Sequence, residues 1–63
     1  MTGKLFLARV KYEQELKDVT DEDIMRVTGW SRKVFRARWA DPGTIRLAEA
    51  EAIGSYLDIK FME

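Results

Sequence analysis

The sequence predicts an all-α domain of four short helices, and three observations lead to that prediction. Apolar residues recur at helical spacing along most of the chain. Residues that cap helices, and glycines that end them, stand between the apolar segments. With 63 residues, of which 46% are apolar, the chain can fill one small core, so we expect a single domain over residues 1–63. A chain of this size buries only about 60% of its unfolded surface, so a partner would add to its stability.

The first helix is predicted over residues 4–17, with Thr2 and Gly3 at its start. Its expected core stripe follows the spacing i, i+3, i+7, i+11 and consists of Leu5, Ala8, Tyr12 and Leu16, flanked by Phe6 and Val10. A strand over residues 4–10 is the alternative, because several residues there have β character. The helix is preferred, since residues 13–17 favour helix and no turn signal interrupts the segment.

The second helix is predicted over residues 21–28, after a Thr20 cap that pairs with Asp23 in a capping box. Its first turn holds three acids, Asp21, Glu22 and Asp23, where the helix dipole favours negative charge. A metal site is the other interpretation of this cluster, but the run lacks the spaced oxygens and the glycine of a calcium loop. The expected apolar face consists of Ile24 and Val27, with Met25 beside them. A tight turn at residues 28–30 follows.

The third helix is predicted over residues 32–40, capped by Ser31. A helical wheel puts Val34, Phe35 and Arg38 on one side, with Trp39 flanking them. The other side carries three cations and two small residues: Arg32, Lys33, Arg36, Ala37 and Ala40. Arg32 and Arg36 are like charges at i, i+4, which costs an isolated helix a few tenths of a kcal/mol. A DNA major groove would favour this pattern, because phosphates neutralise the charge and arginine can bond guanine. A basic surface helix without a partner remains the alternative.

The fourth helix is predicted over residues 45–57, after Asp41-Pro42-Gly43 ends the third and Thr44 caps the next. Its expected stripe is Ile45, Leu47, Ala50, Ile53 and Leu57. Gly54 within this pattern indicates close packing of another helix. Ile59 is expected to complete the core. Phe61 and Met62, in a tail that is extended or folded back, either pack on the first helix or form a dimer contact. Trp30 and Trp39 are expected at the core or its rim rather than as platforms for bases.

Composition excludes several classes of function. The chain has no cysteine and no histidine, so disulfides, thiolate metal sites and the commonest general base are absent. We therefore expect no enzyme activity, no metal and no cofactor. No apolar run is long enough to span a membrane and no signal peptide is evident, so a cytoplasmic protein is expected. Net charge is zero, but residues 26–46 hold six cations against one acid, whereas residues 13–25 hold six acids against one lysine. Such a dipolar protein can orient on a polyanion.

The segment Thr20 to Gly29, T-D-E-D-I-M-R-V-T-G, resembles the first helix and turn of the phage Cro/repressor-type helix-turn-helix proteins, which are lambda-repressor-like and XRE-type. In that family a Thr or Ser caps the helix, a Gly ends it and a hydrophobic residue follows, here Trp30. Residues 45–59 resemble the closing helix of that family, so the resemblance covers roughly residues 5–59. Three places depart from the pattern: Met25 stands where a small residue is usual, Thr28 where an aliphatic one is, and Asp21 and Glu22 where a glutamine often holds a phosphate.

The resemblance implies a lambda-repressor-like fold that binds double-stranded DNA. The residues that would meet bases and phosphates are Ser31, Arg32, Lys33, Arg36, Ala37 and Ala40. The expected function is a Cro-like repressor of a phage or mobile element, in which a homodimer on a palindromic operator blocks polymerase. The alternative from another class is a protein-interaction module, in which the basic helix docks an acidic surface of polymerase or of a repressor.

Overall fold

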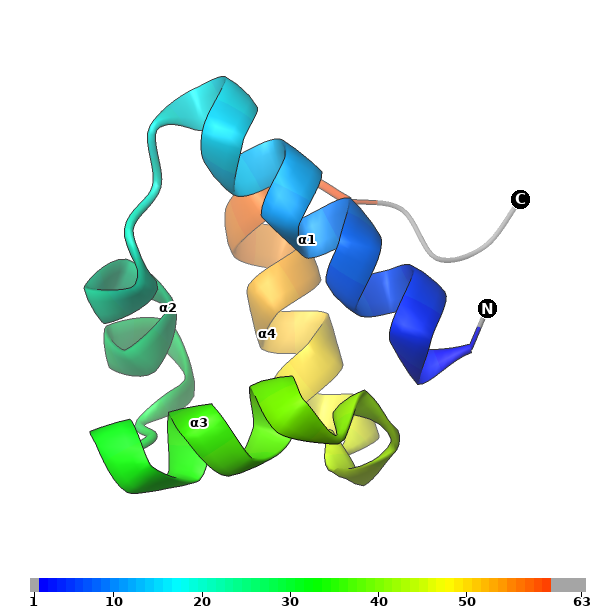
Figure 1. Ribbon diagram of the computed structural model, residues 1–63. Coiled ribbons are helices and arrows are strands. Elements are labelled where there is room, and N and C mark those ends of the chain that lie inside the picture. Colours follow the sequence, from blue (N-terminus) through cyan, green and yellow to red (C-terminus); the bar gives the residue numbers. More distant parts are fainter. Residues whose placement is uncertain (1, 60–63) are drawn as a thin grey trace.

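Four α-helices and one short 3₁₀ turn make up the computed structural model, which describes residues 2–59 (Figure 1). The elements are α1 (Gly3–Lys17), α2 (Asp21–Thr28), α3 (Arg32–Ala40), η1 (Pro42–Thr44) and α4 (Leu47–Leu57). The all-α prediction is confirmed, and residues 4–10 are helix rather than strand. The predicted bounds of α2 and α3 match the observed ones. None of the described helices is long and apolar enough to cross a membrane.

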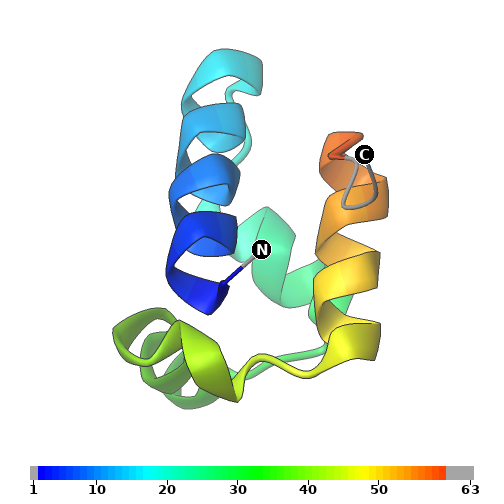
Figure 2. The same cartoon turned by 90° about the vertical axis from the view of Figure 1, so that its right-hand side faces the viewer.

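The helices enclose one core. Helices α1 and α4 run along opposite sides of the molecule, and α3 lies across one end of both (Figures 1 and 2). Each of the four α-helices contributes to the core, as do the turn before α3 and the residues after α4. The core consists of Phe6, Val10, Ile24, Trp30, Phe35, Ile53, Leu57 and Ile59. The prediction that Ile59 completes the core is therefore confirmed.

The core-facing side of α1 differs from the predicted one. Leu5, Tyr12 and Leu16 are 61%, 61% and 64% exposed, and Ala8 is exposed as well. The buried side of α1 consists instead of Phe6, Leu7, Val10 and Glu13. The predicted stripe was wrong because α1 carries apolar residues on two sides, and spacing alone does not reveal which side meets the other helices.

Glu13 makes the buried side of α1 hard to recognise from the sequence, because it is charged and yet only 6% exposed. Its carboxylate lies 3.0 Å from Arg9 Nε and 3.0 Å from Lys17 Nζ. Hydrogen bonds from Lys17 and then from Arg9 hold the pKa of Glu13 below its usual value. Lys17 also donates to the backbone oxygen of Leu57, so this cluster joins the end of α1 to the end of α4.

The start of α4 is a second correction. The helix begins at Leu47 rather than at Ile45, and Thr44 does not cap it. Thr44 belongs to η1, in which its backbone N–H donates to the Asp41 oxygen at 3.0 Å and its hydroxyl donates to the same oxygen at 2.7 Å. The cap position is Arg46, whose backbone N–H donates to the Glu49 carboxylate at 2.9 Å. The prediction failed because Pro42 starts a separate helical turn, which uses Thr44 before α4 begins.

The stripe of α4 is confirmed in part. Ile53 and Leu57 are fully buried, Ala50 packs against the core, and Gly54 is buried as well. Leu47 was wrongly placed in this stripe, since it is 75% exposed. Ile45 precedes the helix and packs against the core from the loop. The predictions for Phe61, Met62 and the tail lie outside the described residues.

A close backbone contact fixes the end of the molecule at which α3 stops. A Cβ atom added to Gly3 would lie 2.7 Å from the Pro42 oxygen and 2.8 Å from the Pro42 carbonyl carbon. Only glycine permits this approach, because real Cβ atoms do not come so near to backbone atoms. The first turn of α1 therefore rests directly on η1, the segment that follows α3.

Candidate functional site

The turn between α2 and α3 determines where α3 begins. Gly29 adopts the left-handed conformation with φ of 80°, and its N–H donates to the Met25 oxygen at 2.8 Å. A residue with a Cβ is strained there, so glycine suits this position. Trp30 then enters the core, and the Ser31 hydroxyl caps α3 by accepting a hydrogen bond from the Val34 N–H. The predicted capping box of α2, between Thr20 and Asp23, is also present.

Aromatic packing holds the inner side of α3 against the core. Phe35 is buried, and its ring centroid lies 4.3 Å from that of Trp39 and 6.4 Å from that of Trp30. The two tryptophans meet edge to face with centroids 6.1 Å apart. Both tryptophans therefore serve packing at the core and its rim, as predicted.

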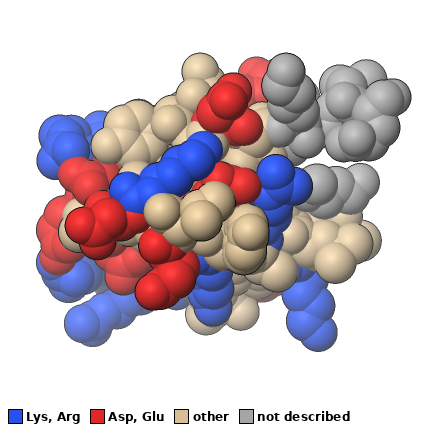
Figure 3. All heavy atoms as spheres, turned by 90° about the horizontal axis from the view of Figure 1, so that it is seen from above, with Lys and Arg blue, Asp and Glu red and all other residues tan. Residues whose placement is uncertain are grey.

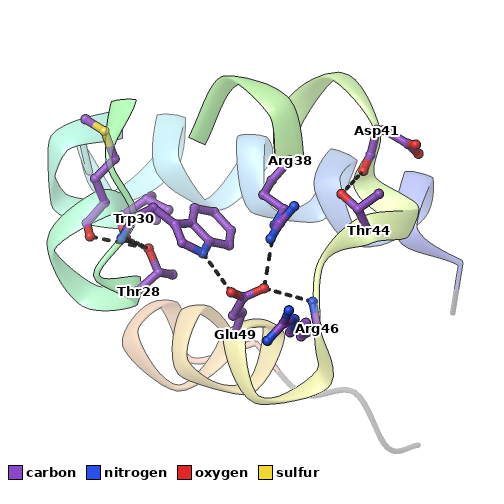
Figure 4. A network of polar contacts seen from close by, with 9 residues as sticks. Thr28, Trp30, Arg38, Asp41, Thr44, Arg46 and Glu49 are labelled. Carbon is purple, nitrogen blue, oxygen red and sulfur yellow. Dashed lines mark hydrogen bonds and ion pairs between the residues drawn. The ribbon is translucent and has the colours of Figure 1, made fainter. Parts of the chain in front are cut away.

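Glu49 of α4 joins three separate segments behind α3 (Figure 4). Its carboxylate accepts a hydrogen bond from Trp30 Nε1 at 2.9 Å and another from the Arg46 backbone N–H at 2.9 Å. Arg38 Nε, which is buried and has no hydrogen-bond partner, lies 3.8 Å from the same carboxylate. The bond from Trp30 and then that from Arg46 lower the pKa of Glu49. Glu49 thus connects the turn, α3 and the start of α4.

The outer side of α3 carries the residues that the sequence predicts to bind DNA. All six are exposed: Ser31, Arg32, Lys33, Arg36, Ala37 and Ala40. Within residues 2–59, Lys33 and Arg36 have no carboxylate within 4.0 Å, so both cations are available to a ligand. Ala37 and Ala40 are small, and they leave the helix surface between the cations open to close approach.

Arg32 is the exception among these cations, because it already has an anionic partner. Its guanidinium lies 2.9 Å from the Glu22 carboxylate, in the first turn of α2. The bond from Arg32 is the main reason that the pKa of Glu22 is lowered. More than half of each side chain is exposed, so the pair is open to solvent and to competing ions. Sequence analysis missed this pair because its members are ten residues apart and on different helices.

The three acids at the start of α2 have three different partners. Glu22 binds Arg32, Asp23 caps the helix through Thr20 and binds Arg26, and Asp21 accepts a hydrogen bond from Gln14 at 3.1 Å. The backbone N–H of Thr20 and then Arg26 lower the pKa of Asp23. Capping and ion pairing therefore account for the cluster, which supports the preferred interpretation over a metal site.

Charge is distributed unevenly over the molecule. Figure 3 looks down on the face opposite the end where α3 lies, and the acidic side chains seen there lie mostly on the side of α2 and the end of α1, with basic side chains among them. The free cations of α3 lie on the other side of the domain. The electrostatic field of a polyanion would therefore favour orientations of the protein in which α3 faces the polyanion.

The site as a whole is an exposed helix face with hydrogen-bond donors and positive charge. Such a face can bind phosphates and the acceptor edges of bases, or carboxylates of a protein. Comparison of the chain with protein-family models, curated proteins and solved structures found no match. The functional argument therefore depends on the geometry of this face alone.

Proposed function

We propose that the protein binds double-stranded DNA sequence-specifically, with α3 in the major groove, and acts as a Cro-like transcriptional repressor of a phage or mobile element. A homodimer on a palindromic operator would exclude polymerase sterically. Ser31, Arg32, Lys33, Arg36, Ala37 and Ala40 form the contact surface. Arg36 and Lys33 are its principal cations.

The observation that carries the proposal is the division of α3 into two sides. Phe35 anchors the inner side, while all six predicted contact residues are exposed on the outer side. Two of the six, Lys33 and Arg36, are cations with no anionic partner within residues 2–59. A rigidly anchored helix that presents unpaired arginine and lysine is suited to the major groove, which is wide enough to admit one helix. The small residues Ala37 and Ala40 would let the helix backbone approach the base edges.

Selection of duplexes from a random pool, followed by titration at several salt concentrations, tests this proposal. We expect a palindromic consensus, and Arg36→Ala should weaken binding about 5- to 150-fold at one defined base pair. Lys33→Gln should weaken binding to all sequences and reduce the salt slope by about one unit. Lys11→Gln removes the same charge from an exposed site on α1 and serves as the matched control, with an expected loss below about twofold. Binding that selects no sequence and vanishes at physiological salt would refute the proposal.

A protein-interaction module is the second candidate, and one observation favours it. Glu22 already neutralises Arg32, so the face is less positive than its arginine content indicates. An acidic protein surface requires fewer free cations than a DNA backbone does. In that case Arg36→Ala would weaken a protein complex, and random duplex DNA would show no steep dependence of affinity on salt.

A further inference from the structure

An apolar stripe runs along the solvent-facing side of α1, between charged edges. Leu5, Tyr12 and Leu16 are each more than 60% exposed, and Ala8 lies between them on the same side. Their spacing of i, i+3, i+7 and i+11 makes one continuous stripe. Figures 1 and 2 show α1 as an edge helix, with the other helices to one side of it and beyond its end. Single exposed apolar residues are ordinary, but three large ones in register on one helix indicate an interface.

We propose that this stripe is the contact surface of a homodimer in which α1 packs antiparallel against α1 of a second copy. The proposal goes beyond the proposed function, since it concerns association of the chain with a second copy of itself, and it can be tested without DNA. A two-fold interface must be complementary to itself, because the same surface is used on both copies. The residues of α1 meet that requirement in size and in charge.

Size complementarity follows from an antiparallel register centred near residue 10. Leu5 at one end of the stripe then lies opposite Leu16 of the second copy at the other end. Tyr12 lies opposite Ala8 of the second copy, so the largest side chain of the stripe faces the smallest. Alternation of large and small residues is what lets two helices pack closely.

Charge complementarity selects the antiparallel arrangement over the parallel one. Lys4, Lys11 and Glu15 lie along one edge of the stripe, and within residues 2–59 none of them has an ion-pair partner. In an antiparallel pair, the edge that carries these residues faces the same edge of the second copy. Glu15 of each copy then meets Lys4 of the other, which gives two ion pairs, while the two Lys11 side chains lie near the two-fold axis and repel each other. A parallel pair would place this edge against the edge that carries Arg9, and the two lysines would be repelled. Opposed helix dipoles also favour the antiparallel pair.

The dimer would separate the two α3 helices. Because Gly3 rests on Pro42, α3 lies at the N-terminal end of α1, and an antiparallel pair puts the two α3 helices at opposite ends. The 15 residues of α1 are about 22 Å long, so the α3 helices are further apart than that. Since α3 lies across that end of α1, the outer sides of the two α3 helices face away from each other in this pair. One helix pair is a small interface, so we expect a dissociation constant in the micromolar range.

Sedimentation equilibrium of the full chain, over about a hundredfold range of concentration, measures this association directly. We expect reversible dimers, and Tyr12→Asp should raise the dissociation constant by at least about 30-fold, as loss of a central aromatic anchor does. Leu47→Asp is the matched control, because Leu47 is the most exposed large apolar residue within residues 2–59 and lies on α4. It should leave dimerisation unchanged.

A charge swap tests the register. Glu15→Lys should raise the dissociation constant about fivefold, since each dimer loses two ion pairs. Lys4→Glu combined with Glu15→Lys should restore it to within about twofold, because the pairs re-form with reversed sign. Both changes suit the dipole of α1, so neither should unfold the monomer.

Several results would overturn the interface. They are a monomer at every concentration, an equal effect of Leu47→Asp and Tyr12→Asp, and no restoration in the double variant. A loss of monomer stability in Tyr12→Asp that does not depend on concentration would also overturn it, since the stripe would then be covered within the chain. If dimers form as expected but no duplex is selected, the interface stands and the proposed function fails. If the protein stays monomeric but still selects a half-site, the proposed interface fails and the DNA-binding function stands.

Discussion

Glu49 is the residue whose removal should reveal most about how α3 is held. Glu49→Ala deprives Trp30 Nε1 of its acceptor, and it removes the carboxylate nearest to Arg38 Nε, which is already buried without a hydrogen bond. It also removes the acceptor of the Arg46 N–H at the start of α4. The turn, α3 and α4 therefore lose a shared anchor in one substitution.

The expected loss can be worked out from these contacts. A hydrogen bond to a charged group contributes about 1.5–3 kcal/mol, and a buried donor left without an acceptor costs about 1–3 kcal/mol. The Glu49 side chain is 21% exposed, so water compensates in part and the lower end of these ranges applies. We expect Glu49→Ala to cost about 3 kcal/mol in total and Glu49→Gln about 1–2 kcal/mol, because the amide oxygen can still accept from Trp30. A chain of this length has only about 3–9 kcal/mol of stability.

Urea unfolding followed by tryptophan fluorescence and circular dichroism measures this loss. At about 4–8 °C per kcal/mol, Glu49→Ala should also lower Tm by about 12–24 °C. Glu51→Ala is the matched control, since Glu51 is an exposed residue of the same helix without an ion-pair partner within residues 2–59. If Glu49→Ala stays within about 0.5 kcal/mol of Glu51→Ala, the carboxylate does not hold these segments together.

Three further predictions concern acid stability, the α1–η1 contact and the Arg32 pair. Within residues 2–59, four carboxyls have a pKa that folding lowers: Glu13, Glu22, Asp23 and Glu49. Their contribution is complete above the usual glutamate pKa of 4.5 and is lost as pH falls through the folded values, so Tm should fall steeply below pH 4.5, and less steeply in Glu49→Gln. Gly3→Ala should cost about 1–3 kcal/mol in urea unfolding, because its Cβ would overlap Pro42, whereas an equal or higher stability would show that η1 yields freely. Glu22→Gln should release Arg32, raise affinity for random duplex and increase the salt slope by about one unit, and an unchanged slope would mean that Arg32 does not reach phosphate.

The parts of the fold that depend on local chemistry were predictable. The bounds of α2 and α3 follow from the caps Thr20 and Ser31 and from Gly29 at the turn, because each acts within a few residues of itself. The outer side of α3 was predictable for the same reason, since Phe35 and Val34 mark the side that must face the core. The DNA-binding role of that face remains a proposal.

The errors had two causes, a competing local turn and a contact between helices. In α4, Pro42 formed a turn that used Thr44, and the helix started two residues later than predicted. In the candidate site, the pairing of Arg32 with Glu22 depends on how α2 and α3 are placed relative to each other. The first of these follows from neighbouring residues and was misread, whereas the second is not contained in any local pattern, because Glu22 and Arg32 belong to different helices.

Helix α1 shows most clearly which features the sequence determined and which only the tertiary structure decided. Its sequence by itself determined that residues 4–17 form a helix with apolar residues on more than one side, because helix formation depends on propensity and spacing along the chain. Only the tertiary structure decided that Phe6 and Val10 enter the core while Leu5, Tyr12 and Leu16 face outward. The physical reason is that a buried carboxylate is tolerated where cations compensate it. Glu13 can be buried because Arg9 and Lys17 neutralise it and Lys17 also reaches the end of α4.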